Sequence, residues 1–304
     1  MTSIPFFSII IPTYNRAHLI LNTLRSIQKQ TFKDYEIIVV DNCSTDNTRE
    51  VLADLIDSGV ISFIQHDRNY ERAMSRNTGM TNAKGKFVTF LDSDDMMRPS
   101  NLQDAFAFTR DQPGYHIFHN LYELINERSQ PIYQYQFRSI KNPVKAIAKG
   151  NFLSCIGVFI SRDIFSNYAF DTNHTLQGIE DWEFWMRILA KYSVGRIPKI
   201  NNGIVHHAGR SITQYNFESY LEKKDYIVNK IKNDQELIRI YGPYLLMFES
   251  SCYMLAASQA NAGGSFGVAR NLLMRAFKKN PLLIFDLRFL RIFEISTLKL
   301  KSKI

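Results

Sequence analysis

The stretch of the chain that decides the fold is Phe87-Val88-Thr89-Phe90-Leu91-Asp92-Ser93-Asp94-Asp95. Its first half is a short apolar run that predicts a buried β-strand, and its second half is rich in carboxylates. Asp92 and Asp94 stand two positions apart on extended backbone, so both can reach one divalent cation. Oxygen ligands favour Mg²⁺ or Mn²⁺ over zinc. The alternative is a solvated acidic turn, and the hydrophobic strand in front of the cluster favours the metal site.

Strands and helices alternate around this stretch. Residues 6–11, 35–40, 61–64 and 86–91 are predicted strands, and helices are predicted over 20–27, around 51–55 and in the stretch ending near Ala83. This alternation predicts an α/β fold with a mostly parallel sheet, in which ligands bind beyond the carboxyl ends of the strands. Polar residues stand there: Thr13 and Tyr14 after the first strand, and Asp41 after the second.

A second acidic group, Glu180 and Asp181, begins a stretch in which apolar residues recur at helical spacing, namely Trp182, Trp185, Met186 and Leu189. Carboxylates in a first helical turn are favourable to the helix dipole, which by itself explains many such pairs. The functional interpretation is a general base, held rigidly at a helix start between two indoles.

Two adjacent histidines and three arginines are weaker candidates. His206 and His207 are ordinary surface residues on one interpretation; on the other, one imidazole completes the shell of a cation bound to Asp94. Neighbours on extended backbone point in opposite directions, so only one of the two should do so. Arg68, Arg72 and Arg76 are either surface charges or ligands for a diphosphate.

Composition limits the class of protein. The chain has 304 residues, 45% hydrophobic and 22% charged, which is typical of a globular protein. Three widely separated cysteines indicate a reducing compartment and no zinc site. No signal peptide and no apolar run of about 18 residues is found, so a cytoplasmic location is expected.

The chain is predicted to divide into residues 1–210, with the strand–helix pattern, and 211–304, which is helical. Residues 264–304 carry nine Lys or Arg against two acids, 9 − 2 = +7 of the formal net charge of +8, interspersed with phenylalanines. This composition fits peripheral contact with an anionic membrane surface. The alternative is a helical pair packed on the catalytic region or on another subunit of a homo-oligomer.

Four motifs in one order resemble the family 2 glycosyltransferases of the GT-A fold, a Rossmann-like sheet flanked by helices, of the inverting kind found in bacterial cell-envelope polysaccharide synthesis. The resemblance covers roughly the first 210 residues. Its motifs are Ser8 to Arg16, Ile38 to Asp46, Arg76-Asn77 through Gly85 to Asp95, and Glu180-Asp181 with Trp185.

The resemblance implies a role for each matched residue. Thr13 and Tyr14 resemble the base pocket, with Asp41 accepting a uracil N3 hydrogen, and Asp181 resembles the catalytic base. Asp94 matches the metal-binding position, and His207 resembles a downstream histidine that joins it. Further positions of the nucleotide-sugar pocket are Pro12, Arg16, Ser93, Arg76 as a supporting residue, and Asp92 at the ribose. Asn42 departs from the acidic residue common in the family.

The expected function is therefore the metal-dependent, inverting transfer of a sugar from a nucleotide-sugar, most simply a UDP-sugar, to a glycan or lipid-linked acceptor. A cation at Asp94 would stabilise the departing diphosphate, and Asp181 would deprotonate the acceptor hydroxyl. An oxidoreductase would need a glycine-rich turn where Pro12 to Arg16 stand. A basic nucleic-acid-binding protein is the alternative, but the charge is confined to the tail and no recognition motif accompanies it.

Overall fold

The computed structural model describes residues 4–134, 140–207 and 217–299, which form two compact units. Unit 1 comprises residues 1–139, 153–172 and 191–210, and unit 2 comprises 140–152, 173–190 and 211–304. Two segments inside 1–210 thus group with the carboxyl-terminal helices. The functional division predicted at 210/211 falls outside the described residues and stays a prediction.

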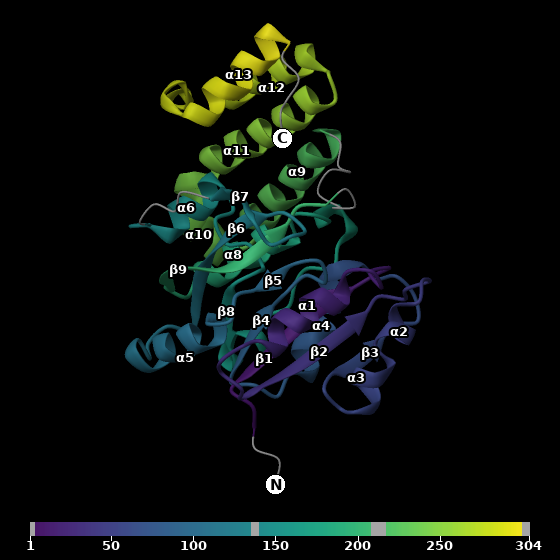
Figure 1. Ribbon diagram of the computed structural model, residues 1–304. Coiled ribbons are helices and arrows are strands. Elements are labelled where there is room, and N and C mark those ends of the chain that lie inside the picture. Colours follow the sequence, from purple (N-terminus) through teal and green to yellow (C-terminus); the bar gives the residue numbers. More distant parts are fainter. Residues whose placement is uncertain (1–3, 135–139, 208–216, 300–304) are drawn as a thin grey trace. The chain divides into compact units, whose positions relative to one another are not determined.

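Unit 1 is built on a nine-stranded sheet in the order β3-β2-β1-β4-β8-β6-β9-β5, with β7 paired to β6 (Figure 1). Its strands are β1 Phe7–Thr13, β2 Tyr35–Asp41, β3 Ser62–Gln65, β4 Phe87–Phe90, β5 Met96–Met97, β6 Ile117–Ile125, β7 Pro131–Gln134, β8 Val158–Ser161 and β9 Val194–Val205.

The first four strands form the parallel sheet that their apolar runs predict. Strand β1 is buried along its whole length and pairs in parallel with β2 and β4, while β3 pairs in parallel with β2. Beyond β4 the sheet is mixed, because β8 runs antiparallel to both β4 and β6, whereas β6 and β9 are parallel. The α/β fold with carboxyl-terminal helices is confirmed, and its sheet is parallel over the amino-terminal strands.

Helices follow the strands of unit 1 in the expected alternation, namely α1 Ile20–Gln28, α2 Thr48–Val51, α3 Ala53–Asp57, α4 Glu71–Asn82, α5 Asn101–Asp111 and α7 Arg162–Phe165. The helix predicted around 51–55 is two short helices that meet at Leu52. Helix α4 packs closely on β1, since a Cβ atom built at Gly79 would lie 2.3 Å from Cγ2 of Ile10. The sheet is thereby held against the helix that precedes β4.

Unit 2 is entirely helical and contains α6 Pro143–Lys149, η1 His174–Leu176, α8 Glu180–Leu189, α9 Phe217–Asn233, α10 Gln235–Tyr241, η3 Gly242–Tyr244, α11 Leu245–Ala262, α12 Phe266–Lys279, η4 Pro281–Phe285 and α13 Leu287–Leu298. Helices α9 and α10 are divided at Asp234, whose carboxylate accepts hydrogen bonds from the N–H groups of Glu236 and Leu237 and caps α10. Within the described ranges, no helix is both long enough and apolar enough to cross a bilayer.

Candidate active site

The ends of β1 and β2 bring the predicted base-pocket residues together. Thr13 and Asp41 are direct neighbours in the parallel register, and both are buried. Ser44 donates to the Asp41 carboxylate through its hydroxyl and its backbone N–H. The buried hydroxyl of Thr13 has no hydrogen-bond partner within the described part of the chain. Buried hydroxyl groups are normally hydrogen-bonded, and a polar atom of a bound ligand would supply the missing partner.

Next to this pair, Pro12 is buried opposite Val40, and Tyr14 is exposed at the strand end. Asn15 follows in the left-handed conformation, with φ of +52°, and its side-chain oxygen accepts from the N–H of Thr45 at 2.8 Å. This bond joins the loops after β1 and β2. Arg16 then lies with its Nε atom 3.7 Å from Oδ2 of Asp94, so the first loop reaches the acidic turn.

Asn42 is built into a network that explains why an amide suits this position. Its Oδ1 accepts from the N–H of Tyr70 at 2.9 Å and lies 3.1 Å from Nδ1 of His66, while its Nδ2 donates to Asn69 at 2.7 Å. A carboxylate could not make the last of these bonds. Burial lowers the pKa of His66 against the opposing charges of Asp67 and Asp41. A neutral ring must therefore carry its proton on Nδ1, since Oδ1 of Asn42 only accepts.

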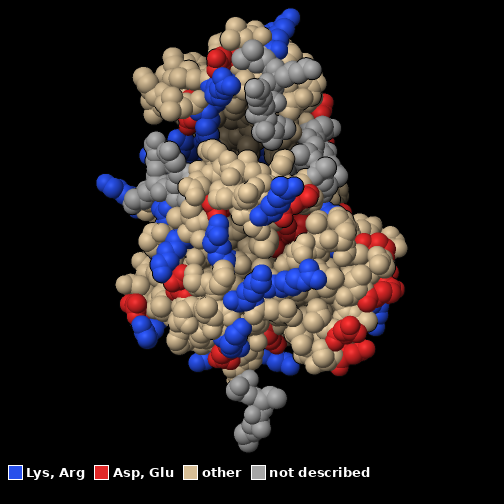
Figure 2. All heavy atoms as spheres, viewed as in Figure 1, with Lys and Arg blue, Asp and Glu red and all other residues tan. Residues whose placement is uncertain are grey.

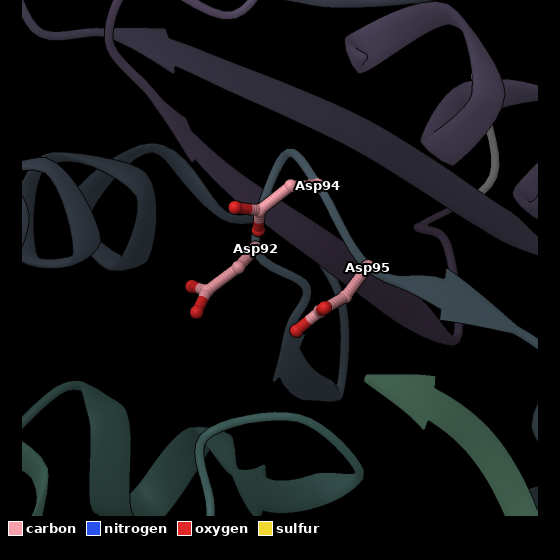
Figure 3. Close-up of side chains that lie close together, drawn as sticks. All are labelled: Asp92, Asp94 and Asp95. Carbon is pink, nitrogen blue, oxygen red and sulfur yellow. The ribbon is translucent and has the colours of Figure 1, made fainter. Parts of the chain in front are cut away.

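The turn after β4 gathers three carboxylates. Asp92, Asp94 and Asp95 each place an oxygen so that the three atoms lie within 4.8 Å of one another. Figure 3 shows the three side chains around this turn. The backbone N–H of Asp95 donates to the carbonyl of Asp92 at 3.0 Å and closes the turn. Ser93 is buried inside it. Three like charges this close favour a bound cation or cationic neighbours.

Each carboxylate also has its own protein partner in unit 1. The buried guanidinium of Arg76 on α4 donates to Asp92 at 3.0 Å. Nε2 of His207 lies 2.9 Å from Oδ2 of Asp94, whereas His206 is exposed. Asp95 accepts from the N–H of Val205, the last residue of β9, at 2.9 Å. The cluster is thus held between α4 and the end of β9.

These donors suit a divalent cation. Carboxylate oxygens with one imidazole fit Mn²⁺ or Mg²⁺, and the cluster lacks the thiolates typical of structural zinc sites. Arg76 counterbalances Asp92. Asp94 and His207, both largely buried, are an oxygen donor and a nitrogen donor that could bind such a cation. Of the three arginines considered from sequence, Arg68 stacks on Tyr70 at 4.6 Å, and Arg76 is bonded to the acidic turn.

Asp181 lies in unit 2, in the first turn of α8. Its Oδ2 accepts from the side-chain amide of Asn151 at 3.0 Å, and its Oδ1 accepts from the N–H of Trp182 at 2.7 Å. Glu180 beside it is buried and accepts from the N–H of Gly178 at 2.7 Å. Burial lowers the pKa of Lys223 on α9 to about 8, and Glu180 partly offsets this effect. The half-buried Asp181 is therefore oriented by two donors.

The two indoles of α8 anchor it in unit 2. Trp182 donates from its ring nitrogen to the carbonyl of Ile147 at 2.7 Å and packs edge-on against Phe248, and Trp185 is fully buried against Phe184. Glu183 is paired with Arg187 at 2.6 Å and with Lys230 at 2.8 Å. Glu183 therefore has a structural role within unit 2.

Ten residues were predicted from sequence for the donor site and the metal site. Nine of them lie at one edge of the sheet, on or directly after β1, β2, α4 and β4. The tenth, His207, reaches this edge from the end of β9. Sequence reasoning missed three residues, namely Asp95, Asn15 and Asn151. A signal existed for Asp95, which belongs to the quoted acidic run, and for Asn15, a residue type that tolerates positive φ. For Asn151 there was none, because its partner stands 30 positions later.

Comparison with known proteins places these features in a wider setting. Residues 8–168 match the family described as Glycosyl transferase family 2. A relative from Escherichia coli, UDP-Glc:alpha-D-GlcNAc-diphosphoundecaprenol beta-1,3-glucosyltransferase WfgD, is 30% identical over 245 residues, covering 79% of this chain and 91% of the relative.

Two solved structures are similar in fold. Residues 1–349 of TarS from S. aureus, in complex with UDP-GlcNAc, have a TM-score of 0.66 at 20% identity, covering 97% of this chain and 92% of that fragment. The mannosyltransferase PcManGT from Pyrobaculum calidifontis, in complex with GDP-Man and Mn²⁺, has a TM-score of 0.63 at 17% identity, covering 97% and 85%. At these identities the likeness supports the GT-A fold alone.

Proposed function

The chain belongs to glycosyl transferase family 2, and from this premise we propose that it moves a sugar from a UDP-sugar to a hydroxyl of a glycan or lipid-linked acceptor in cell-envelope polysaccharide synthesis. The observation that carries the proposal is the carboxylate cluster at the end of β4, joined by His207, within one edge of the sheet. The relative WfgD supports the donor and acceptor classes, since its name gives UDP-Glc and a diphosphoundecaprenol-linked sugar.

For the donor, we propose that the nucleoside lies over the ends of β1 and β2. The uracil would lie against Pro12, Thr13 and Tyr14, with Asp41 accepting its N3 hydrogen and Asp92 meeting the ribose. Ser44 orients the Asp41 carboxylate, and Arg76 holds Asp92 in place. Arg16 and Ser93, at the two loops beside Asp94, complete the pocket. A buried carboxylate oriented in this way discriminates in favour of a base that donates a hydrogen.

For the metal, Asp94 and His207 are the proposed ligands of Mn²⁺ or Mg²⁺, with the carboxylates of Asp92 and Asp95 nearby. A cation there neutralises the charge that develops on the leaving diphosphate. The protein's contribution is orientation, because the bonds to Arg76 and Val205 fix the directions of Asp92 and Asp95. The carboxyl groups do not need to move when the donor arrives.

For the acceptor, we propose that Asp181 removes the hydroxyl proton as the new glycosidic bond forms. Asn151 and the N–H of Trp182 direct its two oxygens, and the first turn of α8 favours the ionised form. A single base with in-line attack inverts the anomeric carbon, whereas a glycosidase would need two carboxyl groups flanking the bond.

Other parts of the predicted function follow from the same premise. We propose that residues 1–210 carry donor binding and transfer, since every proposed site residue lies there. The cytoplasm is the proposed location, supported by three cysteines that are free thiols. The nucleic-acid-binding alternative has no support from the family, whose relatives are transferases.

The decisive experiment compares Asp94→Asn, Asp181→Asn and a matched surface control, Asp57→Asn on α3. UDP-sugars are screened for binding with Mn²⁺ and with a chelator, and transfer to a lipid-linked acceptor is followed. We expect Asp181→Asn to bind donor like the parent and to lose transfer by about 10²–10⁴-fold, the usual contribution of a general base. Asp94→Asn should lose the response of donor binding to Mn²⁺.

Each part of the proposal can fail separately. Full turnover by Asp181→Asn would remove that residue from the mechanism, and donor binding that ignores the chelator would remove the cation. Product configuration, read by NMR, would contradict inversion if it matched the donor. Asp57→Asn should behave as the parent in every measurement, because its side chain is exposed on α3.

A further inference from the structure

The carboxyl-terminal end of unit 2 exposes an unusual amount of apolar surface. Of the sixteen large apolar side chains left exposed in the described ranges, seven lie between residues 282 and 298. We call these seven the C-terminal apolar surface: Leu282, Ile284, Phe285, Leu287, Leu290, Phe293 and Leu298. We propose that this surface, on η4 and α13, docks the protein on an anionic lipid bilayer.

Packing within unit 2 determines which side of α13 remains uncovered. Phe289 and Ser296, seven positions apart, are its buried residues. Leu287, Leu290 and Leu298 fall on the opposite side at helical spacing, and Leu287 is 77% exposed. Phe285, at the end of η4, is 82% exposed. The helix therefore packs by one side and presents leucines on the other, as interfacial helices do.

The charges around this surface suit anionic headgroups. Residues 264–304 carry a net +7, from nine Lys or Arg and two acids. Both acids are already paired inside unit 2: Asp286 with Lys149 at 2.9 Å and with Arg288 at 3.6 Å, and Glu294 with Arg291 at 2.5 Å. Long cationic side chains beside buried apolar groups can extend to the headgroups. Where Figure 1 shows α13, Figure 2 shows mainly uncharged side chains, with a few cationic and acidic ones among them.

The same charge argues against a second copy of this chain as the occupant. Residues 281–298 are themselves neutral, with Arg288 and Arg291 against Asp286 and Glu294, 2 − 2 = 0. Helix α12, which packs on α13, carries four cations and no acid. A symmetric contact through η4 and α13 would bring two copies of this basic helix close together, and like charges placed opposite each other weaken an interface. Binding to a bilayer that contains anionic lipid is instead favoured by both kinds of side chain, because the apolar ones enter the interfacial layer and the cations stay at its surface. Exposed apolar patches rimmed by charge mark such contacts.

The test uses the full chain and vesicles of equal parts phosphatidylcholine and phosphatidylglycerol, with pure phosphatidylcholine vesicles for comparison. The variant Phe285→Ser/Leu287→Ser removes two of the most exposed apolar groups, and its matched control is Ile132→Ser/Tyr133→Ser on β7, also exposed. We expect co-sedimentation of the parent and the control with anionic vesicles. The Phe285→Ser/Leu287→Ser variant should bind at least about tenfold more weakly.

A second variant, Arg288→Gln/Arg291→Gln, isolates the electrostatic part. Its binding to anionic vesicles should fall by roughly fivefold for each cation removed at low ionic strength, and parent binding should weaken as salt is raised. Equal binding by the two serine variants would overturn the proposal, as would a parent that ignores anionic vesicles. So would a dimer, seen by sedimentation, that Phe285→Ser/Leu287→Ser dissociates.

This inference is independent of the proposed reaction. None of the residues changed is placed in the donor pocket, the metal site or the base, so donor binding in solution should be the same in all four proteins. Loss of vesicle binding with intact donor binding would support docking alone. If Asp94→Asn binds vesicles like the parent, loss of the proposed metal site does not affect binding through the C-terminal apolar surface.

Discussion

His119 on β6 is a buried histidine whose protonation opposes folding. Burial, helped by Arg196, lowers its pKa to about 4, and its Nδ1–H donates to the carbonyl of Asn120. In the unfolded chain the pKa of this histidine is roughly 6.5. Below that pH the unfolded chain binds a proton that the folded chain does not bind, so the folded state loses stability as the pH falls from roughly 6.5 towards about 4. We expect the free energy of unfolding to fall by about 2 kcal/mol between roughly pH 7 and pH 5 from this residue, measured by urea denaturation.

The control for this prediction is His174→Gln, which alters an exposed histidine on η1. His119→Gln should lose about 2 kcal/mol of the pH dependence relative to the parent, whereas His174→Gln should keep it. If parent and His119→Gln show the same slope, the buried imidazole is not the group that titrates.

At the level of single residues, the candidate site residues that could be predicted from sequence are those at the ends of strands, because the end of a strand determines where a side chain lies in the site. Thr13, Asp41 and Asp94 are of this kind. The sequence could not show whether His206 or His207 contacts Asp94, because that depends on the direction in which the chain leaves the end of β9. It also could not find Asn151, because a hydrogen bond to Asp181 across 30 positions follows from the packing of α6 and α8 in unit 2.

Among the elements, the contact between α4 and β1 gives a sharp prediction. Gly79→Ala would place a methyl group 2.3 Å from Cγ2 of Ile10, in the middle of a buried strand. We expect the free energy of unfolding to fall by about 1–3 kcal/mol despite the better helix propensity of alanine. The matched control is Gly267→Ala on α12, where nothing lies within 4 Å, and it should be neutral or stabilising by less than about 1 kcal/mol in the same denaturation experiment. Equal effects of the two substitutions would contradict the close contact.

Strands β1, β2 and β4 were predictable because each is dominated by a run of buried apolar residues, and the shorter β3 contributes Phe63 and Ile64. Strand β9 was not, because it carries two consecutive asparagines, Asn201 and Asn202, which are typical of turns. Both are buried, and Asn101 donates to Asn202 at 2.6 Å and accepts from Asn120 at 2.9 Å. Amides from three separate elements thus satisfy one another, and composition alone does not reveal such a network.

On the scale of the whole chain, the two units are interleaved in sequence, which has a consequence for truncation. Helix α8 packs within unit 2 on helices that follow residue 216: Trp182 lies 5.1 Å from Phe248 between ring centroids, and Tyr241 donates to the carbonyl of Met186 at 2.7 Å. A chain ending at residue 210 would expose these surfaces. We therefore expect the fragment 1–210 to aggregate or lack fixed tertiary packing, seen by gel filtration and near-ultraviolet circular dichroism.

The comparison for this experiment is the full chain under the same conditions. A monomeric fragment with the near-ultraviolet spectrum and melting temperature of the parent would show that α8 needs no support from α9 to α11. The functional division near residue 210 would then coincide with a folding boundary. The contacts described above instead predict that the folding boundary and the functional division differ.

The hydrogen bond from Val205 to Asp95 sits one residue before a pair of identical imidazoles. Because side chains alternate along extended backbone, displacing this strand by a single position would substitute one histidine for the other at the acidic turn while leaving the composition of the site untouched. Strand alignment, set partly by a carboxylate 110 positions earlier, therefore determines which imidazole meets Asp94. The irregular pairing of β6 with β9, where the register shifts twice, thereby helps to determine which histidine reaches the acidic turn.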